Sequence, residues 1–353
     1  MPFRQSSHTA IGLDIGSRIV KAAQLESQGA QHRITRLTQW TRGSEGPYMN
    51  AEEIQNLKKV LKKQGFVGRR IVLAVPDEIM LRGTFELPAN AKPDMIPQMA
   101  RMELARMHSI APDAFEMVCW NTPPTVSAQT TKETIAMGCP HDTANAYVDQ
   151  FEQGGMDITA LDVRSAAAAR ACQALAAAPP TITAVVDLGW CSTKLMLLSG
   201  KTIIYERLLE CPSLQILIDK LCKRFDIDHD ATCHIINSIG LALDRQAKEW
   251  DKKSMDAIRR FVRNHVNKML EELTIPFTYV NHHYPGDGVQ CLILIGGGAV
   301  IPGLVTYLDE HINIDVKLGA PSELMECNPQ VATRAANPAA TVSVGLACFF
   351  GGS

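Results

Sequence analysis

The sequence lacks an apolar run that approaches the roughly 20 residues a membrane-spanning helix needs. The Ala-rich stretch from Ala166 to Ala178 is interrupted by Arg170 and Gln173, so it predicts a packed helix instead. Residues 1–8 are polar and lead directly into a predicted strand, a pattern that gives no secretory signal. We therefore expect a soluble, cytoplasmic protein with no direct membrane insertion.

Neither sign of charge dominates the chain. The 35 Lys and Arg residues and the 37 Asp and Glu residues give a formal net charge of −2. This balance provides no electrostatic footprint for nucleic acid, so we expect no nucleic-acid partner. With 353 residues, of which 46% are hydrophobic, the chain is long and apolar enough to form two lobes with cores.

Several signatures of catalysis and metal binding are missing. The ten cysteines form no Cys-x-x-Cys pair, and Cys233 and His234 together with Cys222 lack the spacing of a zinc site. We expect free, largely buried thiols in a reducing compartment. There is no Gly-x-Ser-x-Gly elbow and no Walker A motif, and a dinucleotide-binding fingerprint fails because Ile301 stands where its last glycine would be.

The sequence does contain two matching Asp-x-Gly turns, at residues 14–16 and 187–189, and a triple glycine at 296–298. An apolar run precedes each turn and a strand-like stretch follows it, which predicts a strand, a tight turn and a second strand. One such turn is a common hairpin signal, but two copies in two halves indicate a shared site. The triple glycine fits either a flat ligand against the backbone or a tight strand-to-helix crossover without a ligand.

The residue types in these turns favour a nucleotide. Glycine permits a positive φ and close approach of the backbone, so the N–H groups of each turn can face a phosphate. Asp14 and Asp187 would orient Mg²⁺, which prefers carboxylates together with water and substrate phosphates. Lys21 or Lys194 would add positive charge, although Lys194 can equally point to solvent because the face of its strand is undetermined.

Together with further segments, these motifs resemble the actin-like ATPase superfamily and, within it, the PilM family of type IV pilus assembly proteins. The FtsA proteins are more distant. The resemblance spans nearly the whole chain in the right order. Its segments are Ile11–Lys21, Arg70–Pro76, Thr84–Pro88, Met102–Met107, Gly155–Val163, Ile293–Leu304 and Val344–Ala347.

The resemblance implies an α/β protein with the duplicated, ribonuclease H-like fold of actin-like ATPases and an inserted small α/β subdomain. It places the first lobe at residues 1–180, with the insertion at about 77–154, and the second lobe at residues 181–353. ATP with Mg²⁺ would lie between the lobes. The family further implies a cytoplasmic scaffold, at most a weak ATPase, that binds the N-terminal segment of a PilN-type inner-membrane protein and works with other pilus machinery proteins.

The resemblance also assigns residues to the site. Asp14 and Asp187 are expected as the catalytic pair and as the metal ligands. The residues expected to hold the nucleotide are Gly16, Ser17, Lys21, Gly189, Ser192, Thr193, Gly296, Gly297 and Gly298.

Departures from the family pattern bear on activity. A segment with Pro212 replaces the glycine pair that usually opens a helix after the second turn, and Ile275 stands where relatives carry an Arg-Ser pair. ATP binding is still expected and rapid hydrolysis is not, and these changes leave open that nucleotide binding has been lost. A small-metabolite kinase of the same superfold and an FtsA-like filament-forming protein remain alternatives, which phosphotransfer or nucleotide-dependent polymers would reveal.

The periodicity of apolar residues predicts the main helices of the chain. We expect helices at about 51–64, 95–107, 211–224 and 255–273, and an extended segment at 115–121. The segment 281–288, which contains His282 and His283, is expected as a surface loop.

Overall fold

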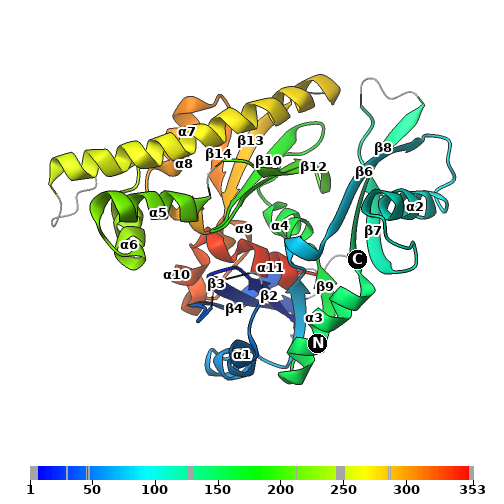
Figure 1. The fold of residues 1–353 in the computed structure, drawn as a ribbon, viewed down its shortest axis with the longest axis horizontal. Helices are drawn as coiled ribbons and strands as arrows, with labels where there is room; N and C mark the ends of the chain where they lie inside the picture. The colour runs from blue at the N-terminus through cyan, green and yellow to red at the C-terminus, as the bar shows by residue number, and fades with distance from the viewer. Residues whose placement is uncertain are drawn as a thin grey trace, which may run out of the picture.

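The structure of the protein is a computed structural model, which describes residues 7–28, 31–44, 46, 48–125, 130–211, 213–243, 251–284, 286 and 288–349. Pro212 therefore lies outside the described residues. Figure 1 shows two large sheets, one above the other, with a smaller sheet at their side. The helices α4 (Arg164–Cys172) and α11 (Thr341–Ala347) lie between the two large sheets.

The first large sheet is built on the first Asp-x-Gly turn. Its strands pair in the order β1-β3-β2-β5-β9, and β4 also pairs with β3. Strand β2 is antiparallel to β3 but parallel to β5. All five residues of β2 are buried, as expected for a strand covered on both faces. The strands are β1 (Ser7–His8), β2 (Ile11–Ile15), β3 (Ile19–Gln28), β4 (Gln31–Thr41), β5 (Arg70–Ala74) and β9 (Asp157–Asp162).

The second large sheet repeats this arrangement around the second turn. Its order is β12-β11-β10-β13-β14, in which β10 pairs antiparallel with β11 and parallel with β13. The two sheets therefore share one pattern of three antiparallel and two further parallel strands, which is the predicted duplication. The strands are β10 (Ile182–Leu188), β11 (Thr193–Ser199), β12 (Thr202–Leu209), β13 (Val289–Ile295) and β14 (Asp315–Leu318).

The small third sheet is the predicted insertion. Its antiparallel strands β6 (Leu81–Pro88), β8 (Thr131–Pro140) and β7 (Phe115–Asn121) pair in that order. Helix α2 (Ile96–His108) packs on this sheet through its own small core. The insertion contacts the second large sheet, where the indole N–H of Trp120 donates to the carbonyl of Ile203 at 2.7 Å.

Helices α4 and α11 form the layer between the large sheets. Small residues permit this close packing: a Cβ on Gly12 of β2 would overlap the backbone of α11, and one on Gly345 of α11 would overlap the backbone of α4. The core of this layer includes Ala168, Val185 and Leu346. Although residues 181–353 were expected to form the second lobe, α11 packs on β2, β3 and α4 of the first.

The outer face of the first sheet is covered by α1 (Ala51–Lys63) and α3 (His141–Gln153).

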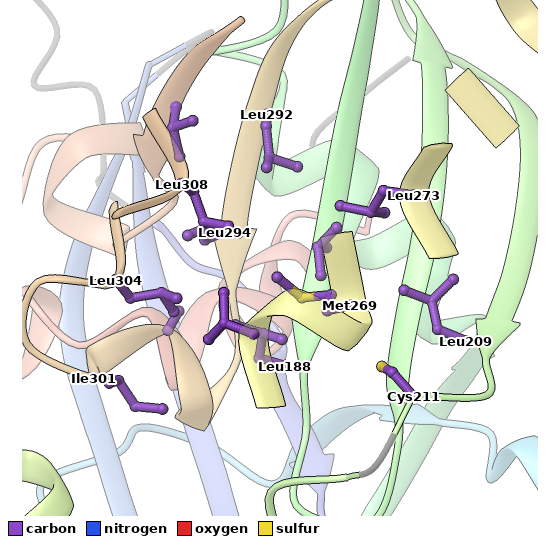
Figure 2. Close-up of a cluster of buried hydrophobic side chains, with 14 of the residues drawn as sticks. Leu188, Leu209, Cys211, Met269, Leu273, Leu292, Leu294, Ile301, Leu304 and Leu308 are labelled. Atoms are coloured by element: carbon purple, nitrogen blue, oxygen red, sulfur yellow. The ribbon is translucent and has the colours of Figure 1, made fainter. Parts of the chain in front are cut away.

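Helices of the second lobe cover the outer face of its sheet. Figure 2 shows Leu188, Leu292 and Leu294 of the sheet facing Met269 and Leu273 of α7 and Leu304 and Leu308 of α8. The helices of this lobe are α5 (Leu214–Phe225), α6 (His229–Ile239), α7 (Lys252–His283) and α8 (Leu304–His311).

Helix α7 is longer than predicted, because it continues through Pro276 to His283. The prediction of a loop from residue 281 was therefore wrong for His282 and His283. A proline inside a helix costs about 3 kcal/mol. Here Leu273, Pro276 and Val280 are all buried against the second sheet, and this packing outweighs the hydrogen bond that Pro276 cannot donate.

Short helical turns complete the fold and position parts of the cleft. They are η1 (Asp77–Ile79), η2 (Gly297–Val300), α9 (Pro321–Leu324), η3 (Pro329–Val331), α10 (Ala332–Ala335) and η4 (Pro338–Ala340). Within the described ranges, no helix is both long enough and apolar enough to cross a membrane.

Candidate functional site

The two Asp-x-Gly turns have the same geometry. In the first, the N–H of Gly16 donates to the carbonyl of Ile19 at 3.0 Å, and in the second, the N–H of Gly189 donates to Ser192 at the same distance. These two amides close their own turns. The amides at the turn tips, such as that of Ser17, are therefore the candidates for binding phosphate.

The two hairpins also repeat an Asp–Lys pairing. Asp14 lies opposite Lys21 in the β2–β3 ladder, and Asp187 lies opposite Lys194 in the β10–β11 ladder. In an antiparallel pair, opposite residues project to the same face of the sheet. Each half of the molecule thus presents one carboxylate and one ammonium group beside its turn.

The first residue of the triple glycine adjoins the second carboxylate. Gly296 follows β13, which pairs in parallel with β10, so it lies beside the end of the strand that carries Asp187. Its φ is +86°, a region that favours glycine, and a Cβ at this position would overlap the carboxylate of Asp187. The turn therefore requires glycine at 296, which brings the backbone of the third motif to the edge of the site.

A cleft of about 450 Å³ lies between the two lobes, where these motifs meet. Most of the residues predicted for the site line this cleft, and they are Asp14, Gly16, Ser17, Lys21, Asp187, Gly189, Ser192, Gly296 and Gly297. The other two, Thr193 and Gly298, line a smaller cavity behind the second hairpin. Ile275, at which we expected the departure from the family pattern to bear on activity, is exposed on α7 and does not line the cleft.

Asp14 lies at the closed end of the cleft and is 1% exposed. Its carboxylate accepts a hydrogen bond from Lys21 Nζ at 3.1 Å and another from Arg164 Nη1. Burial by itself would raise the pKa of Asp14, but the two cations hold the pKa below its ordinary value. The carboxylate is therefore ionised and doubly paired.

Arg164 was not predicted as a site residue. It begins α4, and its guanidinium lies between the two carboxylates of the hairpins, bonded to Asp14 and 3.6 Å from Asp187 Oδ2. Burial opposes its charge, but Asp14, Asp187 and Asp77 together raise its pKa. No local motif indicates this role, because Arg164 is 150 residues from Asp14.

Lys194 does not point to solvent. Its ammonium group lies 2.8 Å and 2.9 Å from the two carboxylate oxygens of Asp77 and 3.4 Å from Glu206 Oε1. Arg82 of the insertion also pairs with Asp77 and lies 3.5 Å from Glu206. Burial would raise the pKa of Asp77, but Lys194, Arg164 and Arg82 lower it to about 2. This cluster ties the second lobe to the base of the insertion.

The two turns also touch each other across the mouth of the cleft. The thiol of Cys191 lies 3.1 Å from the hydroxyl of Ser17, to which it donates. The Arg18 guanidinium lies 4.7 Å from the centre of the Trp190 ring and 2.5 Å from Asp230 of α6. The lobes therefore approach each other through the same turns that would contact a phosphate.

The other end of the cleft is apolar. Its wall is formed by α5, α6 and the chain after η2, through Leu214, Ile218, Ile236 and Ile301, with the amide side chain of Asn237 beside them. Sequence reasoning did not find this wall, because its apolar residues have the same helical spacing as core residues. A flat, mostly apolar group fits between this wall and the backbone of the triple glycine.

The duplicated sheets, the paired hairpins and the cleft between them define an α/β protein of the actin-like ATPase fold. The sequence matches the family described as type IV pilus assembly protein PilM over residues 12–348, and the chain belongs to that family. No curated protein sequence matches the chain.

Solved structures show the same fold. A PilM-PilN type IV pilus biogenesis complex has a chain that superposes with a TM-score of 0.76 at 19% identity, covering 98% of this chain and 99% of that chain. The ethanolamine utilization protein EutJ from Carboxydothermus hydrogenoformans superposes with a TM-score of 0.53 at 13% identity, covering 97% of this chain and 90% of that chain. MreB5 of Spiroplasma citri bound to AMPPNP superposes with a TM-score of 0.51 at 12% identity, covering 96% of this chain and 95% of that chain.

Proposed function

We propose that this chain is an ATP-binding scaffold of type IV pilus assembly. The observation that carries the nucleotide site is the convergence of both Asp-x-Gly hairpins and the triple glycine on one cleft. Turn amides and the cations Lys21 and Arg164 would hold the phosphates at the polar end. The adenosine would lie at the apolar end, between the backbone of Gly297 on one side and the wall formed by α5, α6 and Ile301 on the other.

The nucleotide would act chiefly by favouring one arrangement of the lobes. Ser17 and Cys191 are in contact across the cleft mouth, so a phosphate bound to both turns would alter how the lobes meet. A ligand shifts such an equilibrium by its difference in affinity for the two arrangements. Function then needs binding and release, and at most slow hydrolysis.

The proposed partner is the N-terminal cytoplasmic segment of a PilN-type inner-membrane protein, as in the complex that the solved pilus structure names. This partner would hold the chain, as a cytoplasmic protein, at the inner membrane beside other pilus machinery proteins. The insertion offers a surface for such a segment: a hollow of about 320 Å³ lies between α2 and β7. Arg101, Met117 and Val118 line the hollow, and the side chain of Met102 is exposed on the same helix.

Magnesium at Asp14 and Asp187 stays a prediction, and the surroundings of these carboxylates do not favour it. Arg164 lies between them, and Lys21 contacts Asp14 from the other side. Two carboxylates that already face two cations offer a divalent ion little uncompensated charge. The nucleotide site is therefore proposed from the turns and the cations alone.

Calorimetric titration with ATP tests the nucleotide site. A Cβ at Gly297 would meet no atom within 4 Å, so the Gly297→Val side chain fits the fold but enters the cleft. We expect ATP affinity to fall at least about tenfold, a loss of 1.4 kcal/mol. Gly43→Val is the matched control, because a Cβ there is equally free and Gly43 does not line the cleft. Unchanged binding by Gly297→Val, or no binding by the unaltered protein, would refute the proposal.

The partner surface is tested with a synthetic peptide of the PilN-type N-terminal segment. Val118 of β7 is 55% exposed, and Val67, between α1 and β5 of the first lobe, is 48% exposed. Val118→Glu should weaken peptide binding about tenfold by placing a charge in the hollow, whereas Val67→Glu should leave it unchanged. Equal affinities for the two variants would place the partner elsewhere.

A further inference from the structure

The two halves of the site differ in one respect that the sequence repeat does not suggest. Lys21 contacts the aspartate opposite it, but Lys194 turns away from Asp187 and pairs with Asp77. Asp187 is thus left without its own lysine. The guanidinium of Arg164 lies in the space between Asp14 and Asp187 and serves both carboxylates.

The position of Arg164 is fixed by the fold. Arg164 is the first residue of α4, and α4 packs directly on α11 between the two sheets. A cation in the first turn of a helix opposes the helix dipole, which has a free-energy cost. The carboxylates of Asp14 and Asp187 offset this cost. Arg164 is therefore a resident cation at the polar end of the cleft, and its side chain is still 21% exposed to it.

A divalent ion bound by Asp14 and Asp187 would have to share this space with a guanidinium group. Like charges this close repel each other, and they repel more strongly near a protein surface than in water because the effective dielectric constant is lower. A divalent ion doubles this repulsion. Arg164 and the metal ion therefore exclude each other unless α4 or the arginine side chain moves.

We propose that Arg164 takes the position and part of the charge role of a divalent cation, so that this chain binds nucleoside triphosphate without Mg²⁺. The proposal rests on the nucleotide site proposed above. Guanidinium suits this role because it stays charged and can form two parallel hydrogen bonds to phosphate oxygens. Lys21, which lines the same cleft, would supply the second positive charge.

The first test is ATP affinity in excess EDTA and in MgCl₂, measured by calorimetry. The unaltered protein should bind ATP within about threefold in the two buffers, a difference under 1 kcal/mol. Arg164→Gln should lose at least about tenfold in EDTA, the loss expected for a charged hydrogen bond, and MgCl₂ should restore part of it. Arg106→Gln, in an exposed arginine of α2, is the control and should match the unaltered protein. An unaltered protein that needs Mg²⁺ would overturn the proposal.

A second test needs no nucleotide, so it separates this proposal from the proposed ATP site. Free Mn²⁺ is followed by electron paramagnetic resonance during titration of the protein with MnCl₂. Arg164→Gln should acquire a Mn²⁺ site that the unaltered protein lacks, and the double variant with Asp187→Asn should lose it again. A Mn²⁺ site already present in the unaltered protein and abolished by Asp187→Asn would overturn the proposal, as would a failure of Arg164→Gln to gain one. Absence of ATP binding with this Mn²⁺ pattern intact would refute the nucleotide site and leave Arg164 only as the cation that excludes a divalent ion.

Discussion

The guanidinium of Arg18 lies over the indole ring of Trp190, with its central carbon 4.7 Å from the ring centre. The two residues belong to equivalent hairpins of different lobes, so this contact joins the lobes at the mouth of the cleft. This cation–π contact between partly buried side chains contributes about 0.5–1 kcal/mol, and the pair of Arg18 with the exposed Asp230 adds at most about 1 kcal/mol. These contacts favour the closed arrangement of the lobes by a small free energy, which the binding free energy of a nucleotide can offset.

Arg18→Ala should open the cleft. Losing these two contacts and the hydrogen bond from Arg18 Nη1 to Cys233 Sγ at 3.3 Å shifts the equilibrium between closed and open lobes by about 1 kcal/mol, or roughly fivefold, toward the open form. Small-angle X-ray scattering should show a larger radius of gyration, and ATP should associate faster. Arg106→Ala removes an exposed arginine that pairs with Glu103 within α2, and it should change neither quantity. Identical scattering from the two variants would contradict this role for Arg18.

The thiol of Cys191 should report on the cleft. Cys191 is the exposed cysteine among the ten, and it lines the cleft mouth beside Ser17. Burial raises the pKa of other thiols, such as those of Cys172 and Cys348, so they form less of the reactive thiolate. A maleimide should therefore label Cys191 first, and ATP should slow this reaction. Mass spectrometry identifies the site, and Cys191→Ser should remove the fast phase. A fast phase that survives in Cys191→Ser would show that another thiol is more accessible.

Asp77 should make stability depend on acid pH. Its folded pKa of about 2 lies below the ordinary value of 3.8, so the carboxylate stabilises the fold above about pH 4. This contribution is lost as the pH falls from 4 through 2. At 1.36 kcal/mol for each pH unit, it amounts to at most about 2 kcal/mol, and less because Asp77 is partly exposed.

The measurement is the urea midpoint of unfolding between pH 2 and pH 7. Asp77→Asn should lower the midpoint at pH 7, where Lys194 loses its partner, and the difference from the unaltered protein should shrink toward pH 2. Taking the difference between the proteins removes the effect of other carboxylates with low pKa values, such as Glu53. A difference that stays constant with pH would show that Asp77 acts through packing rather than charge.

The fold was predictable because its signals are local. Strand, turn and strand follow directly from an apolar run, an Asp-x-Gly turn and a second apolar run, and the repeat of this pattern indicates the duplication. Helix α1 begins at Ala51, as predicted, and ends at Lys63, one residue before its predicted end. The end of α7 was missed because buried contacts of Val280 override the effect of Pro276.

The inner arrangement of the site was less predictable, because it depends on contacts distant in sequence. The face of β11 that carries Lys194 follows from its register with β10, but its partner Asp77 lies 117 residues upstream. Arg164 has no motif of its own. It reaches Asp14 and Asp187 because α4 is held between the two sheets by its packing against α11, a helix that lies far downstream in the sequence.

Asp14 and Asp187 should differ in their effect on stability, although they occupy equivalent places in the repeat. Asp14 is 1% exposed and is bonded to both Lys21 and Arg164, so Asp14→Ala leaves two largely buried cations without this partner. Removing one partner of a buried ion pair costs about 3–5 kcal/mol. Asp187 is more exposed and only borders Arg164 at 3.6 Å, so Asp187→Ala should cost about 1 kcal/mol or less. Urea midpoints at pH 7 measure both, with Asp149→Ala, at an exposed position of α3, as the control. Equal losses of unfolding free energy in the two variants would mean that Lys21 and Arg164 stabilise Asp14 and Asp187 to the same extent. That result would contradict the contacts, which favour Asp14.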